Sequence, residues 1–147
     1  MSLLETLQHN PLIGDGAMGT MLYAKGIFIN TCYEQLCLTK PELIERVHRD
    51  YVEAGADLIE TNTFGANRLK LEAHGIADQL EAINRAAVHL ARKVAKPNTY
   101  ILGSVGPLLQ SDQLFSDRHT SELEQLFHEQ IALLADENVD AIQLETF

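Results

Sequence analysis

Apolar residues follow two patterns that alternate along the chain. Long segments carry them at helical spacing, and the short segments between these are almost continuously apolar. The long segments predict amphipathic helices over residues 41–54, 80–94 and 121–137, with a shorter helix over 67–74. The short segments predict strands over residues 12–16, 57–63, 100–104 and 140–146.

Residues that favour helix ends bound these segments. The pairs Thr39–Glu42 and Ser121–Glu124 have the spacing of a capping box at a helix start. Gly55 and Asn138 stand where a left-handed residue ends a helix. The polar segment 110–119 is longer than usual connections, which makes it a candidate functional loop.

Strands that alternate with helices predict an α/β fold with a parallel sheet. Side chains of a strand alternate between its faces, so Ile59 lies on one face of the second strand and Glu60 and Asn62 on the other. The fourth strand repeats this pattern with Ile142 and Glu145. A sheet covered by helices on both faces should be apolar on both, whereas a barrel has a polar mouth. The pattern therefore favours a TIM (β/α)8 barrel over an open sheet.

A complete TIM barrel needs eight strands and about 250 residues. This chain of 147 residues supplies the first four βα units. It is expected to be half of a barrel, and a smaller open sheet is the alternative.

The composition and net charge of the chain limit the classes of partner that it can bind. Eleven basic and 21 acidic residues give a net charge of −10, which repels phosphate backbones and anionic lipids. We therefore expect neither a nucleic-acid partner nor a membrane. The N-terminus has no secretory pattern, and Cys32 and Cys37 resemble reduced thiols. A cytoplasmic location is expected.

Polar residues gather at the predicted carboxyl ends of the strands, where barrel enzymes carry their chemistry. They are Asp15, Asn62, Thr63, Ser104 and Glu145. Two carboxylates could hold an ammonium group, and the hydroxyls and the amide could hold a carboxylate, so an amino-acid-like ligand fits. The alternative is that Asp15 is a turn residue and Glu145 a solvated strand end.

Two other motifs are considered. Gly14-x-Gly16-x-x-Gly19 has the spacing of a dinucleotide fingerprint, but the next strand arrives about 20 residues too late for the ribose-binding acid. A nucleotide-binding α/β domain remains the weaker alternative. Cys32 and Cys37 could be two zinc ligands, but no paired cysteine or histidine completes a set of four.

Four motifs in this order resemble the homocysteine S-methyltransferase domain. They are Ile13–Thr20, Glu60–Phe64, Gly103–Pro107 and Leu144–Phe147. The resemblance covers essentially all of residues 1–147, and it is greatest to the bacterial proteins in which this domain is fused to a methylenetetrahydrofolate reductase. It implies that the chain is the N-terminal half of a (β/α)8 barrel domain, and therefore incomplete.

The resemblance also implies substrate-binding roles. Asp15 and Glu145 match acids that hold the amino group of homocysteine. Thr61, Asn62, Thr63 and Ser104 match segments that line the substrate. The implied reaction moves a methyl group from a donor to the thiolate of homocysteine and gives methionine.

The cofactor implied by the family is zinc, which holds the homocysteine sulfur as a thiolate. The family's three zinc cysteines follow the fourth strand and are absent from this chain, so no metal ligand is assigned here. FAD and folate would be expected if a reductase domain is fused. We expect the chain alone to be inactive, and its unpaired sheet edges to favour self-association or pairing with the missing C-terminal half.

Overall fold

The computed structural model describes residues 2–108 and 120–147. The helices in these residues are α1 (Leu3–Leu7), α2 (Met18–Ala24), α3 (Leu36–Thr39), α4 (Pro41–Ala54), α5 (Arg68–Ala73), the 3-10 helix η1 (Ala77–Gln79), α6 (Leu80–Val94) and α7 (Thr120–Asp136). The strands are β1 (Leu58–Glu60), β2 (Tyr100–Val105) and β3 (Ala141–Leu144). The loop expected over 110–119 lies outside the described residues.

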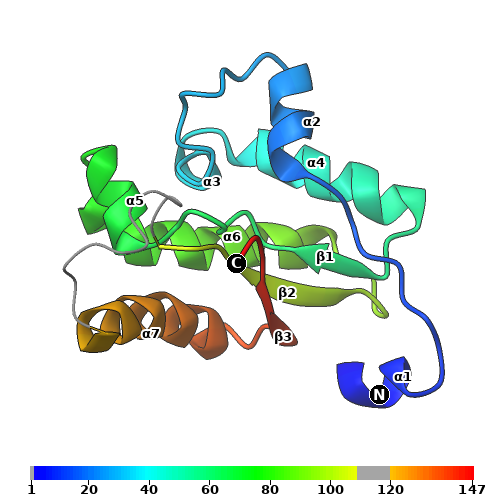
Figure 1. The fold of residues 1–147 in the computed structure, drawn as a ribbon. Coiled ribbons are helices and arrows are strands. Elements are labelled where there is room, and N and C mark those ends of the chain that lie inside the picture. Colours follow the sequence, from blue (N-terminus) through cyan, green and yellow to red (C-terminus); the bar gives the residue numbers. More distant parts are fainter. Residues whose placement is uncertain (1, 109–119) are drawn as a thin grey trace.

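The three strands form one parallel sheet in the order β1-β2-β3 (Figure 1). Glu60 pairs with Leu102, and Ser104 pairs with Gln143. Helix α6 connects β1 to β2, and α7 lies between β2 and β3 in the chain. This confirms the α/β class and the parallel direction of the strands.

The strand expected at 12–16 is reduced to one parallel bridge, between Gly14 and Leu58. The amide of Asp15 donates to the carbonyl of Leu58 at 2.9 Å. The amide of Glu60 then donates to the side-chain oxygen Oδ2 of Asp15 at 3.0 Å. In a continuing ladder that amide would bond to the backbone carbonyl of Asp15. The carboxylate thus ends the ladder, and the prediction of four βα units is not confirmed.

Two of the predicted helix ends are confirmed and two are wrong. Gly55 and Asn138 are left-handed, with φ of 105° and 55°. Helix α4 instead has Lys40 as its N-cap, because the hydroxyl of Thr39 donates back to the carbonyl of Gln35 in α3. Ser121 lies inside α7, which begins one residue earlier.

The helices cover one face of the sheet, as the alternation of side chains predicts. Ile59 and Ile101 pack with apolar residues of α4 and α6, including Val52 and Ala91. Ile142 packs with Leu134 of α7 and its neighbours. None of the helices in residues 2–108 and 120–147 is long and apolar enough to cross a membrane.

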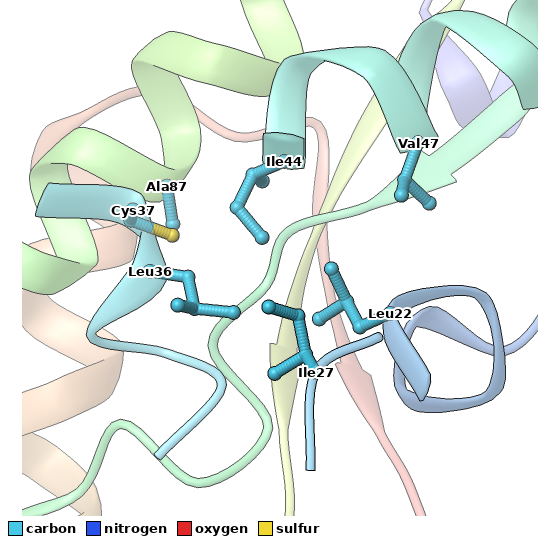
Figure 2. Close-up of a cluster of buried hydrophobic side chains, with 7 residues drawn as sticks. All are labelled: Leu22, Ile27, Leu36, Cys37, Ile44, Val47 and Ala87. Atoms are coloured by element: carbon cyan, nitrogen blue, oxygen red, sulfur yellow. The ribbon is translucent and has the colours of Figure 1, made fainter. Parts of the chain in front are cut away.

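A second apolar cluster fixes the segment between Gly14 and α4 (Figure 2). It joins α2, α3, α4 and α6 through Leu22, Ile27, Leu36, Cys37, Ile44, Val47 and Ala87. Each fully buried leucine or isoleucine contributes about 1.5–3 kcal/mol. This packing holds the connection over residues 25–40 against the carboxyl ends of the strands, where it forms part of the wall described next.

Candidate functional site

A cavity of about 510 Å³ opens at the carboxyl ends of the strands. Five of the six residues predicted from the sequence line it, namely Asp15, Thr61, Asn62, Ser104 and Glu145. These residues come from the segment before α2, from the ends of β1 and β2, and from the residue after β3. The distant acids Asp15 and Glu145 therefore meet at one site.

Asp15 is held in place by backbone on two sides. Its amide bonds to β1, and its carboxylate accepts the amide of Glu60. Burial raises the pKa of Asp15 to about 6, and the charge of Glu145 adds to this effect although the hydrogen bond opposes it. Asp15 is thus an anion at neutral pH whose charge is only partly stabilised by the protein.

Glu60 and Glu145 form a pair of acids in the cavity. Both side chains line the cavity, and Glu145 is close enough to affect the pKa of Glu60. The hydroxyl of Ser104 donates to Oε1 of Glu145. Burial, followed by the contact with Glu145 and the charge of Asp15, raises the pKa of Glu60 well above its usual range. The three acids and the serine hydroxyl make a compact polar group.

Thr61 and Thr63 hold the backbone of Ser104. The amide of Ser104 donates to Oγ1 of Thr61 at 3.1 Å, and Oγ1 of Thr63 donates to the carbonyl of Ser104 at 2.6 Å. The two threonine hydroxyls are 2.7 Å apart. Thr63 is fully buried and is not among the described residues that line the cavity. The structure therefore places this predicted site residue behind the wall.

Asn62 joins the end of β1 to the first connection. Its amide Nδ2 donates to the carbonyl of Tyr33 at 2.8 Å and lies 3.5 Å from Sγ of Cys37. Tyr33 also lines the cavity. The side chain of Asn62 thus fixes the wall as well as facing the cavity.

Sequence reasoning missed two acids of the cavity, Glu34 and Glu60. Glu34 accepts the amide of Gly65 at 2.7 Å and the thiol of Cys32 at 3.4 Å, so it ties two loops together. Nothing in the local sequence marks Glu34. Glu60 could have been found, because it stands on the polar face of β1 within a quoted motif.

The charge of the cavity suits a cationic ligand. Four carboxyl groups line it, and its described lining contains no lysine, arginine or histidine. Such a wall repels phosphate. Helix α2, which begins at Met18 inside the Gly14–Gly19 motif, has only seven residues. The acidic wall and the short helix both disfavour the nucleotide-binding alternative.

The described residues do not fit a zinc site. No group of three histidine, cysteine or acidic side chains in residues 2–108 and 120–147 is arranged to hold a metal ion. Burial raises the pKa of Cys32 to about 11 and that of Cys37 to about 12, which keeps both thiols protonated.

Comparisons with known proteins agree on one family. A family model described as homocysteine S-methyltransferase matches residues 12–147. Methionine synthase of Mycobacterium leprae (strain TN) is 37% identical over 158 aligned residues, which take in 98% of this chain and 13% of that protein. Betaine–homocysteine S-methyltransferase 1 of Rattus norvegicus is 28% identical over 151 residues, covering 99% of this chain and 37% of that protein.

Among solved structures, the metallated form of the homocysteine methyltransferase MmuM from Escherichia coli is similar, with a TM-score of 0.82 and 27% identity. The match covers 97% of this chain and 56% of that one. The chain thus spans between 13% and 56% of the lengths of these proteins. Because the family model matches nearly the whole chain, from residue 12 to residue 147, the chain belongs to the homocysteine S-methyltransferase family.

Proposed function

We propose that this chain is the N-terminal half of a TIM-barrel domain that moves a methyl group to the thiolate of homocysteine and gives methionine. Its own part is to hold the amino acid. The observation that carries this proposal is the meeting of Asp15, Glu60 and Glu145 in one cavity that has no basic side chain in its described lining.

The chemistry of the ligand matches this wall. At neutral pH, homocysteine carries an ammonium group, a carboxylate and a thiol. An ammonium group donates three hydrogen bonds, and ionised carboxylates are its strongest acceptors. Asp15 and Glu145 would orient it, and Ser104 would act through Glu145, whose carboxylate it contacts. Thr61 and Asn62 would complete the wall.

Zinc dependence is part of the proposal only for the complete domain. Zinc, when bound, supplies a thiolate from the homocysteine thiol. Since Cys32 and Cys37 do not form a site for it, its ligands would have to lie outside the described residues. The cytoplasmic location, and FAD and folate in a fused reductase, stay predictions.

The test is calorimetry of the purified chain with L-methionine, with 4-methylthiobutanoate, which lacks the amino group, as the matched ligand. We expect methionine to bind and the analogue to bind at least tenfold more weakly. Asp15→Asn and Glu145→Gln should each weaken methionine binding by about tenfold or more, the value of one charge-assisted hydrogen bond. Equal affinity for the two ligands, or unchanged affinity in both variants, would contradict the proposal.

Self-association is a second candidate property, favoured by the open edge of β3. In the described residues β3 pairs only with β2, and Leu144 and Phe147 beside this edge are 59% and 70% exposed. Unpaired edges promote association of chains. Sedimentation of the chain should show dimers or larger species, and a stable monomer at high concentration would contradict this.

A further inference from the structure

Four acids share one partly buried cavity. Asp15, Glu34, Glu60 and Glu145 all line it, and its volume is about 510 Å³. Ionised carboxylates that face one another in such a site repel each other, and a proton on one of them relieves the repulsion.

The surroundings assign this proton to Glu60. The carboxylate of Glu145 accepts a hydrogen bond from the hydroxyl of Ser104. In the described residues Asp15, Glu34 and Glu145 each accept a hydrogen bond with their carboxylate, whereas Glu60 takes part through its backbone amide, which donates to Asp15. Its carboxyl group faces a cavity that it shares with three other acids, Asp15, Glu34 and Glu145.

The described lining of the cavity contains no lysine, arginine or histidine, and the nearby Lys70, over the ring of Phe64 at 4.5 Å, interacts with Glu34. The other titratable side chain of the described lining is the phenol of Tyr33. Burial and the neighbouring acids shift the pKa of Glu60 upward, which favours its protonated form.

Building on the proposed function, we propose that Glu60 carries a proton in the free site and that the ammonium group of the incoming amino acid displaces it. The ammonium group enters with its three protons, the acid of Glu60 becomes a carboxylate, and one proton leaves to solvent. No covalent bond other than the O–H bond of Glu60 breaks. The positive charge of the ammonium group balances the new negative charge of Glu60. The net charge of the site with its bound ammonium group therefore equals that of the free site.

This exchange gives Glu60 a role in specificity. A ligand without a cationic group cannot release the proton, and the ionised pair that would result is unfavourable in a partly buried cavity. Affinity for the amino acid should also rise with pH below the pKa of Glu60, by about tenfold per pH unit.

The test is calorimetry with L-methionine at pH 7 in two buffers, phosphate and Tris, whose enthalpies of ionisation differ. Methionine has no thiol, so a proton released on binding comes from the protein. We expect about one proton released per methionine bound. Glu60→Gln should still bind methionine and release almost none. Glu53→Gln, which alters an exposed glutamate of α4, should behave as the wild type.

The outcomes separate this inference from the proposed function. Methionine binding without proton release in the wild-type chain overturns the role of Glu60 and leaves the proposed function standing. The same is true if Glu60→Gln releases as many protons as the wild type. If methionine does not bind the wild-type chain at all, the proposed function fails, and this inference fails with it. Should Glu60→Gln not fold, the affinity of the wild type between pH 6 and pH 8 decides, because a flat profile contradicts the exchange.

Discussion

The hydroxyl oxygens of Thr61 and Thr63 lie 2.7 Å apart and together satisfy both backbone groups of Ser104. Thr63 gives its proton to the carbonyl of Ser104, so Thr61 must donate in the bond between the two hydroxyls. Each hydroxyl thus donates once and accepts once. The pair replaces the ladder that β1 no longer provides after Glu60, and it fixes Ser104 where its side chain reaches Glu145.

Replacing Thr63 tests this arrangement. Thr63→Val keeps the shape but leaves the carbonyl of Ser104 and the hydroxyl of Thr61 without their buried partner. We expect a loss of about 1–3 kcal/mol in the free energy of unfolding, measured by urea denaturation. Thr63→Ser should restore most of it, and Thr31→Val, at an exposed position, should change stability by less than about 0.5 kcal/mol. A Thr63→Val chain as stable as the wild type would argue against the hydroxyl pair.

Gly106 allows Phe64 to line the cavity. A Cβ atom at Gly106 would lie 2.5 Å from Cε2 of Phe64, and the Gly106 amide donates to the Phe64 carbonyl at 3.0 Å. Gly106→Ala should displace the ring, weaken methionine binding and lower stability by about 1–3 kcal/mol.

The matched control for this change is Gly14→Ala, where no atom lies within 4 Å of the added Cβ. It should change stability by no more than about 1 kcal/mol. Both variants are compared by urea denaturation and calorimetry, and equal behaviour of the two would show that Phe64 is not constrained by Gly106.

We expect the negative charge of Asp15, which would bind the ligand, to lower the free energy of unfolding at neutral pH. Its pKa is raised from 3.8 to about 6 in the folded protein, so the folded state holds this proton more tightly than the unfolded state. The contribution of Asp15 to stability is therefore full below pH 4 and is lost as the pH rises through 6. Asp15→Asn keeps an oxygen for the amide of Glu60 and removes the charge.

We expect Asp15→Asn to be more stable than the wild type at pH 8 by about 1–2 kcal/mol, a value reduced for the partial exposure of the site, and about equally stable at pH 4. Urea denaturation at both pH values measures this. A variant that gains the same stability at both pH values would show that charge is not the cause.

His48 of α4 has the opposite effect to Asp15 on the pH dependence of stability. It is fully buried, and neither ring nitrogen has a hydrogen-bond partner among the described residues. Burial lowers its pKa from 6.5 to about 4, so the unfolded chain takes up a proton first when the pH falls. Stability is then lost between about pH 6.5 and pH 4, by roughly 3 kcal/mol.

His48→Leu should remove this loss. The free energy of unfolding is measured at pH 7 and pH 4 for the wild type and for the variant, and the two pH-dependent differences are compared. The acidic residues are the same in both proteins, so their contributions cancel in this comparison. His74→Leu, at an exposed position, serves as the control. If His48→Leu and the wild type lose the same stability on acidification, His48 is not the group responsible.

The sequence by itself determined the class of fold and most of the site. Helical and alternating patterns depend on local periodicity, so α4, α6 and the direction of the strands could be predicted. Gly55 and Asn138 were predictable as helix ends, because a left-handed residue is a local requirement. The acids Asp15 and Glu145 could be placed at strand ends, and the parallel strands then bring them to the same edge.

Only the tertiary structure decided how these residues are used. The ladder at Gly14 ends after one bridge because a side chain from the same segment takes the next amide of β1. Thr63 became a support of Ser104, and Glu34 and Glu60 entered the cavity, through contacts between residues 31 to 85 positions apart in the chain. No local pattern records such contacts, because hydrogen bonding and the shift of a pKa depend on which groups meet after the chain has folded.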